Sequence, residues 1–130
     1  MNMTIQEVAN RLAVLQGVVD KAWPVKLAYA VSVNIDHLQR AADPAEKQRR
    51  QILERFARKD ENGMPVIENN QYVIDDMDGF RKDIDQLMSE EADVDIRMVD
   101  AAVLDACDQE RYDPVTPGTL LALKFMIKEE

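Results

Sequence analysis

Apolar residues recur at helical spacing in the first part of the chain and outline two amphipathic helices. The first helix begins at Thr4 and Glu7, which have the spacing of a capping box. The second follows Pro24, because proline suits the first turn of a helix. Since only a few residues connect the two stripes, we expect an antiparallel helical pair. The stripe positions are Ile5, Val8, Leu12, Leu15, Val19 and Ala22 in the first helix and Ala28, Val31, Ile35, Leu38 and Ala42 in the second.

The end of the second helix is ambiguous in the sequence. Asp43 and Pro44 have the residue types of an N-cap and a first turn. Either a new helix begins at this point, or one long helix continues with a kink at the proline. Up to Lys59 the chain carries few apolar residues and many basic ones, which predicts a helix with a narrow buried edge and a cationic outer face.

The second part of the chain combines short β-rich runs with helical segments. Residues 64–67 and 71–74 are β-rich and flank a polar turn at 68–70, which predicts a hairpin. Residues 93–98 alternate between polar and apolar types, which predicts a half-buried strand that adds to the hairpin as a third strand. Further helices are expected to begin at Asp76 or Asp78, at Asp100, and at Thr116 followed by Pro117.

These elements predict an α+β fold, with an antiparallel helical pair, a small antiparallel sheet made of the hairpin and the third strand, and flanking helices. The length of 130 residues fits a single domain, with a helical part at 1–59 and an acidic α+β part at 60–130. The first residues lack the features of a secretory signal, and no apolar stretch approaches the roughly 20 residues of a membrane span, so we expect a cytosolic location.

The net charge of −9 is distributed unevenly along the chain. Residues 40–59 carry a net charge of +4 and residues 60–113 a net charge of −13, while the flanking segments are neutral. Such acidity argues against a general phosphate-binding protein. Three interpretations remain: the acidic part lies against the basic helix, it pairs with a partner or a second copy, or it imitates the charge of nucleic acid.

Few residues offer catalytic or metal-binding chemistry. His37 and Cys107 are the only imidazole and thiol, which excludes a zinc cluster or a disulfide built within the chain, and nothing in the pattern brings them together. The acids around Gly79 resemble a calcium loop, but Ile74 then occupies the first ligand position and has no oxygen to offer. The glycines and serines match no phosphate loop or nucleophile elbow. We therefore expect a protein that is not an enzyme and that uses neither cofactor nor metal.

The candidate binding residues lie in three places. The helix after Pro24 is apolar on more than one face, so either another subunit or the hairpin or final helix of the same chain covers it. The basic cluster before residue 60 is expected to pair with the acidic part, with nucleic-acid contact or small-ligand sequestration as alternatives. The candidates are Val25, Lys26, Tyr29 and Val33 on the second helix, Arg55, Arg58 and Lys59 in the basic cluster, and Asp93 and Asp95 on the third strand.

The order of several motifs resembles that of a family of small proteins from tailed phages and prophages, catalogued as a domain of unknown function (number sixteen-seventeen). The resemblance rests on residues 23–30 with Asn34, on the charged helix end at 58–63, on the hairpin at 66–74, on the helix start at 76–80, on residues 94–96, and on Thr116 with Pro117. It covers most of the chain from about residue 23, and it departs at Pro44, where the family pattern implies an unbroken helix. The resemblance implies a phage origin and supplies no catalytic residue.

Together these observations favour a non-enzymatic phage interaction or assembly protein, oligomeric, which acts in or alongside the virion. The alternative is an acidic phage-encoded inhibitor of a host defence system that occupies a nucleic-acid-binding site. In both cases the expected location is the host cytoplasm or the virion. The expected partner is a protein or a second copy of the chain, with no membrane and no direct contact with nucleic acid.

Overall fold

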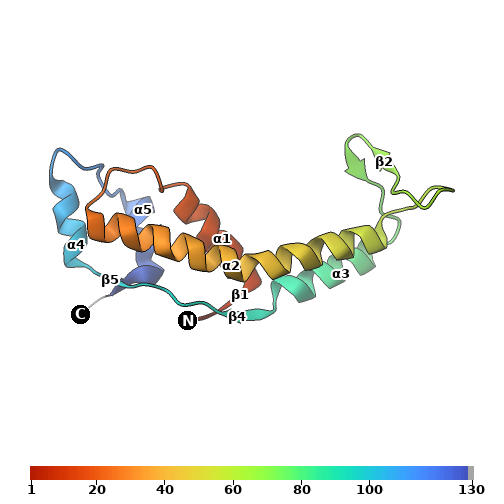
Figure 1. The fold of residues 1–130 in the computed structure, drawn as a ribbon, viewed down its shortest axis with the longest axis horizontal. Helices are drawn as coiled ribbons and strands as arrows, with labels where there is room; N and C mark the ends of the chain where they lie inside the picture. The colour runs from red at the N-terminus through yellow and green to blue at the C-terminus, as the bar shows by residue number, and fades with distance from the viewer. Residues whose placement is uncertain (129–130) are drawn as a thin grey trace.

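One long helix, α2 (Val25–Phe56), runs along most of the long axis of the molecule (Figure 1). The computed structural model describes residues 1–128, apart from the side chain of residue 108. At a rise of 1.5 Å per residue, the 32 residues of α2 span about 48 Å. All other elements are arranged along this helix, so the fold is α+β with α2 as its spine.

The predicted helical pair is confirmed. The helix α1 (Ile5–Gln16) packs on α2 and runs in roughly the opposite direction (Figure 1). Thr4 Oγ1 accepts a hydrogen bond from the Glu7 amide at 3.1 Å, as the capping box predicts. The helix ends at Gln16 and not near residue 22, because the chain turns at Gly17 and reaches α2 through a loop.

Pro44 lies inside α2, so the chain adopts one continuous helix at the point where the sequence left two alternatives. A proline has no N–H to donate, and the ladder of backbone hydrogen bonds therefore lacks one bond there. The side chain of Pro44 is exposed.

The predicted hairpin is confirmed and protrudes from the end of the molecule at which α2 finishes (Figure 1). It consists of β2 (Ile67–Glu68) and β3 (Gln71–Tyr72), which pair antiparallel. Asn69 and Asn70 connect them with positive φ angles of 51° and 64°. Asparagine tolerates this left-handed conformation, which matches the twist of a tight two-residue hairpin turn.

The third strand does not join the hairpin. Instead β4 (Glu91–Asp93) pairs antiparallel with β1 (Asn2–Thr4), and residues 94–98 continue in an extended form outside any strand. The helix α3 (Met77–Met88) explains the difference, since it packs along α2 and carries the chain away from the hairpin. Polar–apolar alternation identifies a half-buried extended segment but not its partner.

The last part of the chain returns to the beginning of α2. It forms β5 (Val99–Asp100), α4 (Ala102–Asp105), the 3₁₀ turn η1 (Ala106–Asp108), α5 (Pro117–Leu123), the 3₁₀ turn η2 (Lys124–Met126) and β6 (Ile127–Lys128). Asp76 and Thr116 cap α3 and α5 as predicted. Asp100 does not cap a helix, because it pairs with Lys128 in the parallel β5–β6 ribbon and Ala101 occupies the cap position of α4.

Asn34 is the one buried polar side chain of the described residues, and it attaches the extended segment to α2. Its Nδ2 donates to the Arg97 carbonyl at 3.0 Å and its Oδ1 accepts from the Arg97 amide at 2.7 Å. The side-chain amide thus makes the two hydrogen bonds to the Arg97 backbone that a neighbouring strand would otherwise make. One helical turn further, His37 Nδ1 lies 2.6 Å from the carbonyl oxygen of Asp95 and adds a second attachment.

The hydrophobic core lies around the first half of α2 and is formed by side chains from both ends of the chain. Val94 and Val99 reach it from the two ends of the extended segment. The other core members are Met3, Val8, Leu12, Leu15, Trp23, Leu27, Ala30, Val31, Leu38, Cys107, Leu123, Met126 and Ile127. The core therefore forms only when α1, α2 and the last thirty residues pack together.

Replacing Asn34 is expected to destabilise the protein strongly. The Asn34→Ala change leaves the amide and the carbonyl of Arg97 without their partner in a partly buried place, at a cost of about 1–3 kcal/mol. Chemical denaturation followed by circular dichroism measures this loss. Ser32→Ala, on the exposed face of the same helix, serves as the control, and equal unfolding free energies for the two variants would contradict the assignment.

Pro44→Ala is expected to stabilise the protein. The change restores the missing backbone hydrogen bond of α2 at an exposed position and raises the free energy of unfolding by about 1–3 kcal/mol. The denaturation midpoint measures it directly. An unchanged or lower midpoint would contradict this expectation.

Candidate functional site

A hollow of about 470 Å³ opens where α2 begins, between this helix and the segment that Asn34 holds in place. We call it the α2 hollow. One wall comes from the first turns of α2 and the other from residues 97–103, with β6 at the rim. It is lined by Val25, Lys26, Tyr29, Arg97, Met98, Val99, Asp100, Val103 and Lys128.

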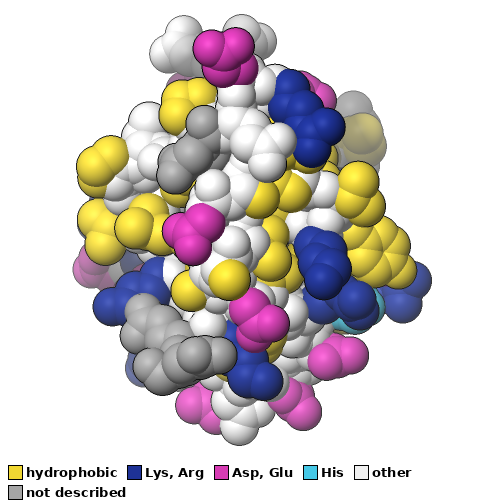
Figure 2. All heavy atoms as spheres, turned by 90° about the vertical axis from the view of Figure 1, so that its left-hand side faces the viewer, with side chains coloured by type: hydrophobic (Ala, Val, Ile, Leu, Met, Phe, Trp, Pro, Cys, Tyr) yellow, Lys and Arg dark blue, Asp and Glu magenta, His cyan; other side chains and the backbone are white. Residues whose placement is uncertain are grey.

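Two apolar side chains of the α2 hollow are strongly exposed. Val25 retains 82% of its accessible surface and Tyr29 retains 56%. The Arg97 guanidinium lies over the Tyr29 ring, 5.0 Å from its centroid, and this cation–π contact orients both side chains. Figure 2 faces the end of the molecule at which α2 begins and shows hydrophobic side chains at the surface beside Lys and Arg side chains. Neither the hairpin nor the final helix of the same chain covers Val25.

The charge of the α2 hollow is positive although the chain is acidic. Lys26, Arg97 and Lys128 line it, against the single carboxylate of Asp100. Apolar surface ringed by bases is suited to an apolar side chain that has acidic neighbours. Its lining residues include no imidazole, no thiol and no pair of carboxylates.

The candidate residues of the basic cluster lie elsewhere and are engaged within the chain. Arg55 pairs with Asp83 at 3.4 Å, and Arg58 makes two hydrogen bonds with Asp75. Lys59 Nζ donates to a backbone carbonyl of α2 at 2.8 Å. These contacts favour the interpretation in which the acidic part lies against the basic helix.

The remaining candidates do not belong to the α2 hollow. Asp93 Oδ1 lies 3.0 Å from the amino group of Met1, and the side chain of Asp95 is exposed on the extended segment. Val33 is half-buried further along α2. Of the nine candidates, the structure thus brings together Val25, Lys26 and Tyr29.

The opposite wall of the α2 hollow was not found from the sequence. Arg97, Met98, Val103 and Lys128 stand about 70 to 100 positions after the helix that they face. The alternation in residues 93–98 gives no signal for this wall, because it places Met98 on the same face as the buried Val94, whereas Met98 is 42% exposed. Their meeting with α2 depends on the Asn34 contact.

A second hollow, of about 410 Å³, lies where α1, α2 and α3 meet. Its lining is mostly apolar and includes Leu12 and Met88. Its two charged residues, Glu46 and Arg49, form an ion pair at 2.7 Å, and this pairing lowers the pKa of Glu46. The hollow offers no unpaired charge that would select a ligand.

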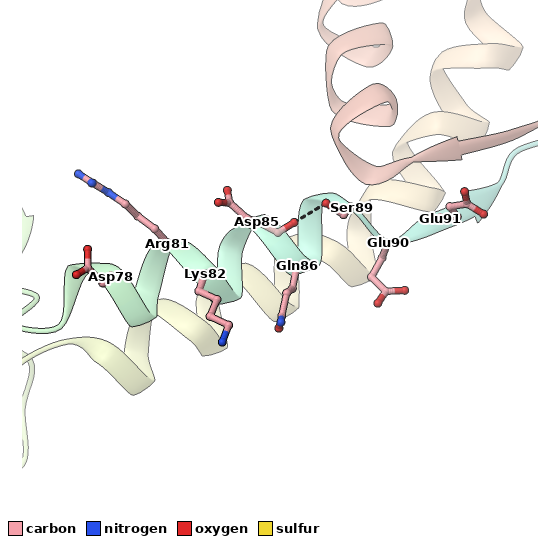
Figure 3. Close-up of a pocket in the computed structure, with 8 residues that line it drawn as sticks. All are labelled: Asp78, Arg81, Lys82, Asp85, Gln86, Ser89, Glu90 and Glu91. Carbon is pink, nitrogen blue, oxygen red and sulfur yellow. Dashed lines mark hydrogen bonds between the residues drawn. The ribbon is translucent and has the colours of Figure 1, made fainter.

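The outer face of α3 carries a row of charged and polar side chains (Figure 3). Asp78, Arg81, Lys82, Asp85 and Glu90 point away from the helix in different directions, so they do not converge on a common point. Along this face Arg81 and Lys82 stand between Asp78 and Asp85, and Glu90 and Glu91 follow the end of the helix. In the part of the chain that the structure describes, no three His, Cys, Asp or Glu side chains are grouped so as to hold a metal ion.

Comparison with known proteins adds no identification, because no family model, no curated protein and no solved structure matches the chain. Within residues 1–128, no helix combines the length and the apolar character that a membrane crossing needs.

The Arg58–Asp75 pair leads to a prediction about pH. Hydrogen bonding to the Arg58 guanidinium lowers the pKa of Asp75 below its usual value. The pair therefore stabilises the fold above the usual carboxyl pKa, about 4, and this contribution is lost as the pH falls through the lowered value. In Arg58→Gln the pKa of Asp75 is expected to rise to its usual range, as measured by NMR titration of the side-chain carboxyl carbon.

Lys59→Gln is the matched control for this titration. It removes the same charge from the neighbouring position, but Lys59 bonds a backbone carbonyl and not Asp75. The pKa of Asp75 is expected to stay low in this variant. A pKa that is the same in the wild type and in Arg58→Gln would contradict the pairing.

Proposed function

We propose that this chain is a non-enzymatic interaction protein of a tailed phage, which assembles into or alongside the virion and binds a protein partner through the α2 hollow. The observation that carries the proposal is the exposure of Val25 and Tyr29 beside the bases of the hollow. Burying one such side chain in an interface gains about 1.5–3 kcal/mol. A partner that covers both therefore gains about 3–6 kcal/mol, and its other contacts with the hollow must supply the rest of the binding free energy.

The arrangement of polar side chains supports a binding role. The imidazole of His37 holds the extended segment, Cys107 is buried in the core, and the charged side chains of α3 point apart (Figure 3). The proposed phage origin rests on the resemblance in motif order described above. Host cytoplasm or virion is the location that this origin implies.

The alternative of an acidic inhibitor that imitates nucleic acid receives less support. Arg81 and Lys82 interrupt the acids on the outer face of α3, and Asp75 and Asp83 pair with arginines. Carboxylates that are already paired within the chain contribute less to an imitation of the phosphate backbone, whose charges meet the bases of the partner. The exposed apolar residues of the α2 hollow also have no role in that mechanism.

The proposal predicts that Val25→Glu weakens partner binding without unfolding the chain. A tagged chain is expressed in cells that produce the encoding phage, and its cross-links to phage structural proteins are quantified by mass spectrometry. We expect the variant to reduce these cross-links about tenfold or more, because a carboxylate replaces a valine that the partner buries.

Leu121→Glu is the control for this experiment. Leu121 is also an exposed aliphatic residue, at 74%, but it lies on α5 outside the α2 hollow. Cross-linking of this variant should equal that of the wild type. If Val25→Glu and Leu121→Glu cross-link as the wild type does, the α2 hollow is not the partner site and the proposal fails.

A further inference from the structure

The hairpin end of the molecule carries a second exposed apolar surface. Ile67 and Tyr72 stand directly opposite each other in the β2–β3 pair, so their side chains lie on the same face. Ile67 is 61% exposed, Tyr72 is exposed as well, and so is Met64 on the loop that precedes β2. We call these three residues the hairpin tip.

Backbone hydrogen bonds hold the hairpin tip in a defined position. The Val66 amide donates to the Arg58 carbonyl and the Arg58 amide donates to the Val73 carbonyl, each at 2.7 Å. The hairpin is thus attached to the residues that directly follow α2. It is a fixed projection of the spine and presents a preformed apolar surface.

The charges at the two ends of the molecule are complementary. Residues 60–76 contain five acids and no base. Asp75 is paired with Arg58 and Asp76 caps α3, which leaves Asp60, Glu61 and Glu68 against Lys59, which bridges to Pro65 at the base of the hairpin, so this end stays net acidic. The α2 hollow, in contrast, is lined by three bases and one acid. An apolar projection with acidic neighbours therefore matches an apolar hollow with basic ones.

A hairpin tip cannot reach the hollow of its own chain. The α2 hollow lies where α2 begins and the hairpin lies beyond its other end, about 48 Å away (Figure 1). A contact between the two surfaces must therefore join different copies of the chain. The volume of the hollow, about 470 Å³, lies in the range of cavities that accept a small group of side chains.

We propose that the hairpin tip of one copy docks into the α2 hollow of the next copy, so that the chain assembles head to tail. This inference rests on the proposed function and names the occupant of the hollow as a second copy. Because the two contacting surfaces differ, every copy in such an assembly keeps one hollow and one hairpin available for the next. Contacts of this kind produce open chains, or closed rings where the rotation between copies allows.

The test uses two variants, each of which damages one surface. Val25→Glu places a carboxylate in the α2 hollow, where it repels the acidic hairpin end. The double change Ile67→Gln and Tyr72→Thr removes the apolar hairpin tip but keeps residues that a strand tolerates. Circular dichroism checks that both remain folded, and Lys26→Glu provides a second hollow variant at an exposed position.

Sedimentation velocity across a dilution series measures the size of the species that each variant forms. The wild type and Leu121→Glu associate beyond a dimer as concentration rises, and high salt weakens this association. Each damaged variant alone stays monomeric, with self-association at least about tenfold weaker. An equimolar mixture of the two variants forms a dimer of two chains and no larger species, because one intact hairpin meets one intact hollow.

Three outcomes would overturn the head-to-tail contact. They are a wild type that stays monomeric, a hairpin variant that associates like the wild type, and a mixture that stays monomeric. If cross-linking to phage proteins still depends on Val25 in any of these cases, only the head-to-tail contact fails and the proposed function stands. If the head-to-tail pattern is observed but cross-linking is independent of Val25, the proposed function fails and the contact between copies stands.

Discussion

The fold depends on one side-chain amide that takes the place of a β-strand. Asn34 forms two hydrogen bonds with the backbone of Arg97 from a fully buried position on α2. A buried amide is costly unless its donors and acceptors are satisfied, so this side chain stabilises only the arrangement in which residues 94–98 lie along the helix. Val94 and Val99 then enter the core at the two ends of that segment. The contact joins the acidic part of the chain to the helical part.

The same contact creates the candidate site. With its backbone held by Asn34, Arg97 places its guanidinium over the ring of Tyr29, and Met98 reaches the surface next to it. The two walls of the α2 hollow are therefore fixed relative to each other without a partner. A preformed surface loses little conformational entropy when it binds, which favours recognition of another protein by this end of the molecule. At the other end the hairpin is attached equally closely to the residues that follow α2.

Local features were predictable and long-range partners were not. The capping box at Thr4, the hairpin turn at Asn69 and Asn70, and the cap at Thr116 depend on residues a few positions apart, and the structure contains all of them. The partner of the strand near residue 93 and the second wall of the α2 hollow depend on contacts between distant segments, which spacing does not encode. The chain around Pro44 was partly predictable. The local residues permit either a new helix or one continuous helix, and the packing of α3 on α2 favours the continuous one.

In the proposed assembly, α2 separates two binding surfaces, one at each end of the molecule. An NMR titration of the isotope-labelled wild type against its own concentration tests this most directly, because it observes both ends in one experiment. We predict that the backbone amides of residues 25–29 and 97–103 and those of residues 64–72 shift together, with a common concentration midpoint. Shifts at only one of these two regions, or no shifts at all, would contradict it.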